Sequence, residues 1–294
     1  MKIGVYGQFY HDDSEIYIQY ILDALQKKEV EIVVEEKFLK RINKHKEISK
    51  NYSNISSFKT IDKSYDFFLS IGGDGTLLKS VTYVRDLGIP IIGINTGRLG
   101  FLATIQKEEI TQSLSQILNG DYYISDRSLL SVETNPTNKD ISKLNFALNE
   151  VAINRKNTTS MIKIETEVNN NHLTSYWSDG LIISTPTGST GYSLSCGGPV
   201  IDPSNGSVVI TPIAPHNLNA RPIVIPDNST IKLKVSGRGK SHLVSLDSRI
   251  ATLKNNTIIT ITKASFCIKL VQLSEDSFIQ TLRKKLLWGE DKRN

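Results

Sequence analysis

The chain has 294 residues, of which 39% are hydrophobic and 22% charged, so it can form one large or two ordinary domains with a substantial apolar core. This composition excludes a disordered tail, and no apolar run approaches the roughly 18 residues of a membrane helix. The formal charge of +5 is compatible with anionic substrates or with nucleic acid. The two cysteines, neither in a CxxC pair, predict neither a disulfide framework nor a zinc site, and we expect a soluble, cytoplasmic protein.

Strands and helices alternate in the first part of the chain. Four near-continuous apolar runs predict buried strands: 2–6, 30–34, 65–71 and 90–95. After the first strand, apolar residues follow at helical spacing: Ile18, Ile21, Leu22 and Leu25. A second helix is expected over 76–86, whereas the polar, lysine-rich stretch 40–64 is interpreted as a variable excursion. The pattern favours an α/β domain over residues 1–126, with an open, mostly parallel sheet covered on both faces.

After about residue 126 the pattern changes to short alternating runs separated by Asn, Asp, Gly and Pro, which is typical of antiparallel strands. Two of these runs, 256–262 and 265–271, lie near the end of the series. We therefore expect an all-β sandwich over residues 127–271. The remaining segment, 272–294, carries apolar residues at four-residue steps and predicts a C-terminal helix that packs back on the first domain.

The stretch FLSIGGDGTLLKS, residues 68–80, places one carboxylate, Asp74, among glycines at the end of a predicted strand. Glycines let a ligand approach the backbone, and free amides at the start of a helix favour phosphate oxygens. Because Asp74 would repel phosphate, we expect it to face a substrate hydroxyl or a metal shared with phosphate. In phosphoryl transfer, one carboxylate orients the attacking hydroxyl and accepts its proton. The alternative is that Asp74 only caps the helix.

A second polar feature, Asn149-Glu150, interrupts the apolar run LNFALNEVAI. Adjacent residues of a strand face opposite sides, so this pair costs stability unless both side chains find partners. A ribose hydroxyl for Glu150 and an adenine edge for Asn149 would satisfy them, by the chemistry that dinucleotide sites use. A local bulge or turn is the alternative.

A third feature, SDGLIISTPTGSTGYSLSCGGP at 178–199, is rich in hydroxyls and glycines. It suits a polar, hydroxyl-rich ligand, with the ring of Tyr192 available for adenine. It contains no GxSxG pattern, so a nucleophile elbow is disfavoured. The five histidines form no HxxxH or HxxE pattern and are interpreted as structural.

Five motifs resemble the bacterial NAD kinase family in their order and spacing, over nearly the whole chain: GGDGT (72–76), INTGRLGFL (94–102), NE (149–150), DGLIISTPTGSTGYSLSCGGP (179–199) and NARPIVIP (219–226). GGDGT alone is less specific, since lipid kinases and phosphofructokinases look similar there. Two departures stand out. Gly191 replaces an alanine that is common in relatives, and Arg249 stands where many relatives have glutamine. Arg249 is therefore left out of the predicted site.

The resemblance implies transfer of the γ-phosphate of ATP to the 2′-hydroxyl of the adenosine ribose of NAD, giving NADP, with Asp74 as proton acceptor. It also implies a divalent metal, most simply Mg²⁺, carried mainly by substrate phosphates, with no protein residue assigned as a metal ligand. The expected assembly is a homodimer or homotetramer. The residues expected to bind NAD and ATP are Asp74, Gly75, Lys79, Asn149, Glu150, Asp179, Thr187, Thr190, Gly191, Tyr192, Ser193, Leu194 and Ser195.

Three other functions were weighed against this interpretation. A lipid kinase would share the GGDGT turn but would need an apolar acyl channel, against which the hydroxyl-rich 185–195 segment argues. A non-catalytic sensor would bind the dinucleotide without transferring phosphate. A nucleic-acid binder is disfavoured because the basic residues lack interleaved aromatics at a stacking spacing. We therefore expect neither a nucleic-acid nor a membrane partner.

Overall fold

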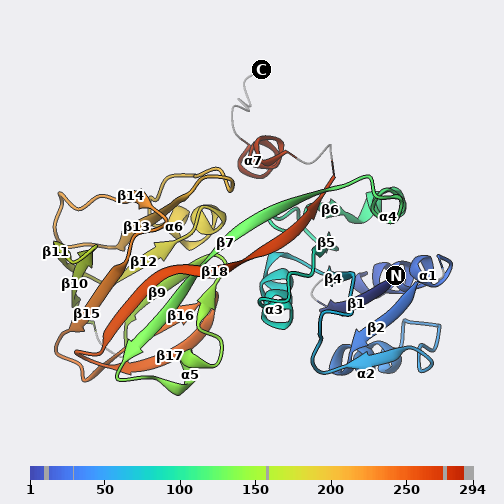
Figure 1. The fold of residues 1–294 in the computed structure, drawn as a ribbon, viewed down its shortest axis with the longest axis horizontal. Helices are drawn as coiled ribbons and strands as arrows, with labels where there is room; N and C mark the ends of the chain where they lie inside the picture. Colours follow the sequence, from blue (N-terminus) through green and yellow to red (C-terminus); the bar gives the residue numbers. More distant parts are fainter. Residues whose placement is uncertain (10–12, 29, 157–158, 274–276, 288–294) are drawn as a thin grey trace. The chain divides into compact units, whose positions relative to one another are not determined.

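The computed structural model describes residues 1–9, 13–28, 30–156, 159–273 and 277–287. The chain divides into two compact units (Figure 1). Unit 1 comprises Met1–Asp126 and Ile268–Asn294, and unit 2 comprises Arg127–Cys267. Each unit has its own cluster of buried apolar side chains. Within the described ranges, no helix is long and apolar enough to cross a bilayer.

Unit 1 is built on a parallel sheet. Its elements are β1 (Lys2–Gly7), α1 (Ser14–Gln26), β2 (Glu31–Glu35), α2 (Glu36–Lys44), β3 (Ser56–Phe58), β4 (Phe67–Ile71), α3 (Asp74–Val84), β5 (Ile91–Asn95), β6 (Ile105–Gln106), the 3₁₀ turn η1 (Lys107–Glu109), α4 (Ile110–Asn119) and α7 (Phe278–Leu286). The strand order is β3-β2-β1-β4-β5, and both β6 and the last residues of β18 (Ile258–Gln272) pair with β5. All these pairs are parallel, which confirms the predicted sheet.

Both faces of this sheet are covered, as the near-continuous apolar strands predict. Alternate residues of β4, Phe67, Leu69 and Ile71, belong to the core cluster that also contains the apolar faces of α1 and α4. Phe68 points to the other face, where its ring stacks on Tyr83 of α3 with 6.0 Å between centroids. Because successive side chains of a strand point to opposite faces, alternate side chains of β4 pack against the helices on each face of the sheet.

The stretch 40–64 is more ordered than its polar composition predicts. Helix α2 continues to Lys44, and β3 adds an edge strand to the sheet. Tyr52 is fully buried in the core, and its hydroxyl lies 2.9 Å from the Asp23 carboxylate. A few widely spaced apolar residues of the stretch are buried while the lysines between them are exposed, and the expected variability of this segment stays a prediction.

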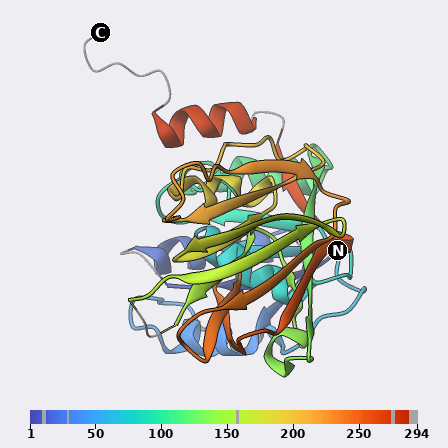
Figure 2. The same cartoon turned by 90° about the vertical axis from the view of Figure 1, so that its left-hand side faces the viewer.

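Unit 2 is an antiparallel β-sandwich, whose strands are coloured green to orange in Figure 2. Its elements are β7 (Tyr123–Asn135), the helical turn α5 (Lys139–Ser142), β8 (Phe146–Ala147), β9 (Glu150–Arg155), β10 (Ile162–Val168), β11 (Asn171–Ser178), β12 (Gly180–Ser184), the 3₁₀ turn η2 (Thr187–Thr190), the helical turn α6 (Tyr192–Ser195), β13 (Ser207–Ile213), β14 (Ile223–Pro226), β15 (Ile231–Ser236), β16 (Ser241–Leu246), β17 (Arg249–Lys254) and most of β18. One sheet has the order β14-β13-β12-β9-β16-β17. In the other, β11-β10-β15-β18 are neighbours, and β7 pairs with β18 and β8.

Two strand predictions in unit 2 need correction. The run LNFALNEVAI is not one strand: β8 ends at Ala147, β9 begins at Glu150, and a bend separates them. Conversely, the two runs at 256–262 and 265–271 form a single strand, β18. Burial falls on odd-numbered residues up to Ile261 and on even-numbered residues from Ala264 to Leu270, so the strand continues although the alternation shifts by one residue at the junction.

The predicted C-terminal helix is present as α7, and it groups with unit 1. Ser277 caps it by accepting a hydrogen bond from the Gln280 amide at 3.1 Å. The Phe278 ring of α7 lies 6.4 Å from that of Phe101, and Lys285 donates to the Leu99 carbonyl. Helix α7 therefore contacts the loop that follows β5.

Candidate active site

The glycine-aspartate turn lies at the position where an open α/β sheet binds ligands. Strand order reverses between β1 and β4, and such a reversal opens a crevice at the carboxyl ends of the two strands. The turn leaves β4 through Gly72, whose φ of +143° is readily available only to glycine. Across the crevice, Thr76 Oγ1 lies 3.2 Å from Oε1 of Gln8, the residue after β1. The strand order therefore indicates this turn as the ligand-binding position, independently of its sequence motif.

Asp74 is held by three consecutive backbone amides of the loop after β5. Its Oδ2 accepts from Phe101 at 2.8 Å, while Oδ1 accepts from Leu102 at 3.0 Å and Ala103 at 3.1 Å. A Cβ at Gly100 would lie 2.0 Å from Oδ1, so glycine is required for this approach. A carboxylate has about four acceptor sites, which leaves one for a further donor.

This arrangement rules out the capping alternative for Asp74. Gly73 occupies the N-cap of α3, and no side chain caps that helix. The next two predicted residues, Gly75 and Lys79, are both exposed on the first turns of α3. Within the described residues Lys79 has no ion-pair partner, so its ammonium group is available to an anion.

One group of potential metal ligands exists among the described residues, and it lies outside the predicted site. It consists of Glu15, His45 and Glu47, each of which has one potential ligand atom within 4.8 Å of those of the other two. His45 also stacks on Phe9, with ring centroids 4.8 Å apart. Neither carboxylate is close in sequence to the glycine-aspartate turn, and we assign the group no part in the predicted reaction.

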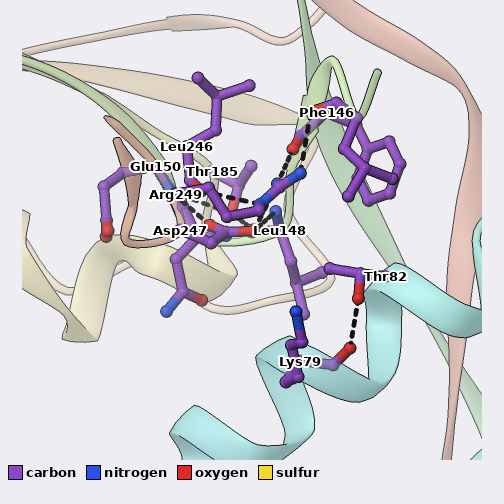
Figure 3. Close-up of polar contacts among 11 residues, drawn as sticks. Lys79, Thr82, Phe146, Leu148, Glu150, Thr185, Leu246, Asp247 and Arg249 are labelled. Carbon is purple, nitrogen blue, oxygen red and sulfur yellow. Dashed lines mark hydrogen bonds and ion pairs between the residues drawn. The ribbon is translucent and has the colours of Figure 1, made fainter. Parts of the chain in front are cut away.

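In unit 2, the Asn149-Glu150 pair is fixed at the bend between β8 and β9. Figure 3 shows Asp247 lying beside this bend. Its Oδ2 accepts from the Leu148 amide at 2.6 Å, and its Oδ1 accepts from the amides of Asn149 at 2.8 Å and Glu150 at 3.2 Å. On the opposite side, the Thr185 hydroxyl donates to the Leu148 carbonyl at 2.6 Å. The turn that was the alternative interpretation is therefore present, and it is held from both sides.

The side chains of the pair remain available to a ligand. Asn149 Oδ1 and Glu150 Oε2 are buried, and neither atom has a hydrogen-bond partner in the part of the chain that the structure describes. The pKa of Glu150 is raised to about 7, first by burial and then by the negative charge of Asp247, while the backbone N–H of Tyr192 opposes the rise. Glu150 therefore exchanges its proton near neutral pH, and an incoming donor would satisfy its free oxygen.

Only some residues of the hydroxyl-rich segment 178–199 lie near the Asn149-Glu150 pair. A Cβ at Gly191 would lie 3.2 Å from Glu150 Oε2, and Tyr192 beside it is 40% exposed. In contrast, Ser193 is fully buried, and its hydroxyl is 2.8 Å from that of Thr211. Gly191 and Tyr192 thus lie with Glu150, whereas Ser193 has a structural partner.

The other predicted residues of unit 2 lie on either side of these positions. Thr187 is buried, and its carbonyl accepts from the Thr190 hydroxyl at 3.3 Å. Leu194 is half-buried and Ser195 exposed in α6. Asp179 forms an ion pair with Arg155, with 3.1 Å between Oδ1 and Nε. Its partial exposure leaves it able to contact a ligand as well.

Sequence reasoning missed Asp247 and left Arg249 out of the site, and the contacts of Arg249 are with the chain itself. Arg249 donates to the carbonyls of Leu246 at 3.0 Å, Leu144 at 2.8 Å and Phe146, and its guanidinium lies 3.8 Å from Asp247. Asp247 occupies the two-residue turn of the β16–β17 hairpin, where aspartate is a common turn residue. An aspartate in such a turn is already explained by the turn itself. The sequence therefore gives no sign of its contact with residues almost a hundred positions earlier.

The parallel sheet has a carboxylate at its switch point, and the β-sandwich has unsatisfied buried polar groups. Both features fit the class of nucleotide-dependent phosphotransferases. Residues 3–122 match the ATP-NAD kinase N-terminal domain, and residues 148–273 match the ATP-NAD kinase C-terminal domain. The chain belongs to the NAD kinase family.

Relatives and solved structures agree with this assignment. The chain is 62% identical to an NAD kinase of Christiangramia forsetii and 55% identical to one of Flavobacterium psychrophilum, over the full length of both chains in each case. A yeast NADH kinase crystallised with NADH matches with a TM-score of 0.84 at 22% identity, covering 99% of this chain and 88% of the other. An Archaeoglobus fulgidus NAD kinase in complex with ATP matches with a TM-score of 0.75 at 24% identity, covering 98% and 99%. These two structures establish the fold alone.

Proposed function

We propose that this protein is an ATP-dependent NAD kinase that phosphorylates the 2′-hydroxyl of the adenosine ribose of NAD to give NADP. The observation that carries the proposal is the Asp74 carboxylate, held by three amides at the switch point of a sheet whose domain matches the family. The full-length identity to proteins named NAD kinase supports the same activity.

In unit 1, Asp74 is proposed to orient the attacking hydroxyl and to accept its proton through the one acceptor site that the amides leave. A carboxylate is a weak base for an alcohol, so proton transfer comes late, after bond formation to phosphorus has begun. The turn at Gly75 and the ammonium group of Lys79 would hold the phosphates. The contribution of unit 1 is therefore positioning and charge neutralisation.

In unit 2, Asn149 and Glu150 are proposed to bind the adenosine part of NAD. Their unpartnered oxygens are acceptors of the type that an exocyclic adenine amine and a ribose hydroxyl would satisfy. Tyr192 supplies an exposed ring against which a base can stack, and Asp179 with the 187–195 segment completes the surface. We propose residues 1–126, 127–271 and 272–294 as the nucleotide-binding domain, the dinucleotide-binding domain and the returning helix.

The donor set fits a Mg²⁺ ion carried mainly by substrate phosphates. Such ions keep several waters and are held largely by substrate phosphates, and we assign this ion no protein ligand, because the hydroxyl takes the one acceptor site that Asp74 retains. When bound, the ion would neutralise charge on the transferring phosphoryl group. We place the protein in the cytoplasm, where both substrates are found.

The protein is proposed to act as a homodimer or homotetramer, as the family resemblance implies. Unit 2 has large apolar residues exposed on its edge strands β11 and β14: Trp177 is 51% exposed and Val224 48%. We expect a native mass of two or four chains by light scattering, and a smaller mass for Trp177→Glu. A wild-type protein that remains a single chain at micromolar concentration would contradict this proposal.

The activity is tested with purified protein, NAD, ATP and Mg²⁺, and NADP is quantified with an NADP-specific dehydrogenase. Parallel reactions replace ATP with GTP or polyphosphate and NAD with NADH. NADP formed at a rate that scales with enzyme concentration supports the proposal. Tight binding of NAD without NADP under every donor and metal would instead indicate a sensor, and phosphorylation of lipid vesicles without NADP would indicate a lipid kinase.

A further inference from the structure

The β16–β17 hairpin turn carries a buried charge whose position a simple turn does not explain. Asp247 and Ser248 have φ values of 45° and 70°, the positive values required by a two-residue type I′ turn. Turn aspartates are normally exposed, yet the Asp247 side chain is only 3% exposed. Burial raises the pKa of this carboxyl group, and its three backbone donors and Arg249 oppose that rise, so these contacts offset part of the cost of burying its charge.

Those contacts are the three amides of the bend that presents Asn149 and Glu150. A bend has no neighbouring strand to pair its amides, and a buried amide without an acceptor is destabilising. Asp247 supplies both of its oxygens, one to Leu148 and one shared by the next two amides. Asparagine has one acceptor oxygen and would turn an NH₂ group toward the Leu148 N–H. Three consecutive amides therefore select a carboxylate rather than an amide side chain.

Arg249 holds the chain before the bend by its carbonyl oxygens. Its three hydrogen bonds join the hairpin to the carbonyls of Leu144 and Phe146 as well as to its own turn. Asp247 takes amide hydrogens and Arg249 takes carbonyls, and Figure 3 shows the two side chains next to each other. We call this pair the hairpin clamp. It fixes residues 144–150 from one side, while Thr185 fixes them from the other.

We propose that Asp247 is a positioning residue of the phosphotransfer reaction: through the hairpin clamp it directs Asn149 Oδ1 and Glu150 Oε2 toward the adenosine half of NAD. This inference rests on the proposed function. Both oxygens are buried and unpartnered within the described residues, so the bend leaves them free for a ligand. The chain holds the peptide groups of this pair firmly while it keeps their side-chain acceptors unsatisfied.

The charge of Asp247 also acts on Glu150. The groups that face Glu150 are the Asp247 carboxylate from the hairpin and the Tyr192 N–H from α6, and the guanidinium of Arg249 lies beside Asp247. Burial raises the pKa of the Tyr192 hydroxyl, and the charges of Cys196 and Asp179 raise it further. Because the negative charge of Asp247 raises the Glu150 pKa, a neutral residue at 247 should lower it and shift the pH range in which Glu150 accepts a hydrogen bond.

The test compares Asp247→Asn with a control in the same turn, Ser248→Gly, which suits the positive φ of that position. In Asp247→Asn we expect the KM for NAD to rise about tenfold or more, consistent with one lost buried hydrogen bond, and the KM for ATP to change less than twofold. The acidic limb of kcat/KM for NAD should move to lower pH. Ser248→Gly should leave all three unchanged.

Three outcomes are distinguishable. A folded Asp247→Asn protein whose KM for NAD and pH profile both match the wild type would overturn the inference, as would equal losses for NAD and ATP, which indicate a structural role only. If Asp247→Asn does not fold, Asp247→Glu provides the test: it keeps the charge on a longer side chain, so the KM should rise without the pH shift, and an unchanged KM overturns the inference. A wild-type protein that forms no NADP would instead refute the proposed function.

Discussion

Replacing Asp74 with Asn is expected to lower the rate of NADP formation by about 10²–10⁴-fold, the range that general-base residues contribute. Asparagine cannot accept a proton, and its NH₂ group would face the Phe101 N–H, which now donates to Asp74 Oδ2 at 2.8 Å. Initial rates with saturating NAD, ATP and Mg²⁺ measure the first effect. Calorimetric titration with NAD should show that dinucleotide affinity changes less than tenfold.

The structural contacts of Asp74 require a stability measurement beside the kinetic one. Because Asn keeps one acceptor oxygen, we expect the free energy of unfolding to fall by about 1–3 kcal/mol while the protein remains folded. The control is Asp86→Asn, an exposed carboxylate just after α3, which should change neither rate nor stability. If the rate loss of Asp74→Asn is below tenfold, or disappears when the assay is cooled to restore the fold, Asp74 is only a loop anchor.

The sheet of unit 1 was predictable because local sequence determines it. Near-continuous apolar strands of five to seven residues require burial on both faces, and only a parallel sheet between helices provides that. The glycine-aspartate turn was also predictable as a site, since glycines after a buried strand place free amides at the sheet edge. The loop at 101–103, which holds the Asp74 side chain, contacts it only through backbone amides. Backbone donors leave no signature in a sequence.

The hairpin clamp was hidden for a different reason. Asp247 contacts residues 97–99 positions away, and its local setting, a dipeptide between two alternating runs, predicts only a turn. Arg249 was left out of the site because many relatives have glutamine there, and in the structure its guanidinium donates to backbone carbonyl oxygens. Long-range pairs of this kind follow from tertiary packing, which periodicity does not encode.

The two units solve one geometric problem in the same way. In each, a carboxylate accepts three consecutive backbone amides, with one oxygen taking two of them: Asp74 from residues 101–103 and Asp247 from 148–150. The difference is in what is positioned. In unit 1 the aspartate is itself the proposed reacting group, and the loop orients it. In unit 2 the aspartate orients the loop, whose side chains are the proposed ligands of the adenosine.

Replacing Glu150 with Gln is expected to stabilise the ligand-free protein at pH 8.5 while it weakens NAD binding. The pKa of Glu150 is about 7 in the folded protein, against an ordinary value of 4.5. The folded state therefore binds this proton more tightly than the unfolded state, and stability falls as pH rises from about 4.5 to 7 and stays reduced above it. Glutamine has nearly the same shape and carries no charge, so the variant should not lose stability as the pH rises.

Thermal unfolding at pH 5.5 and 8.5 measures the effect. The midpoint of Glu150→Gln should exceed that of the wild type by roughly 2–4 °C or more at pH 8.5, and by less at pH 5.5, where Glu150 is already largely protonated. Glu133→Gln, an exposed acid in the same unit, is the matched control and should show no pH-dependent difference. A gain that is equal at both pH values would mean that the charge of Glu150 is not the cause.

The same variant should lose function as it gains stability. Glutamine presents an NH₂ group on one side, so a ribose hydroxyl that now finds a charged acceptor would meet a weaker neutral one, and kcat/KM for NAD should fall about tenfold to a hundredfold. The unpartnered carboxyl oxygen is then best understood as a destabilising feature that substrate binding relieves. If Glu150→Gln were more stable and equally active, the buried charge would have no role in recognition, and Asn149 alone would have to hold the adenosine.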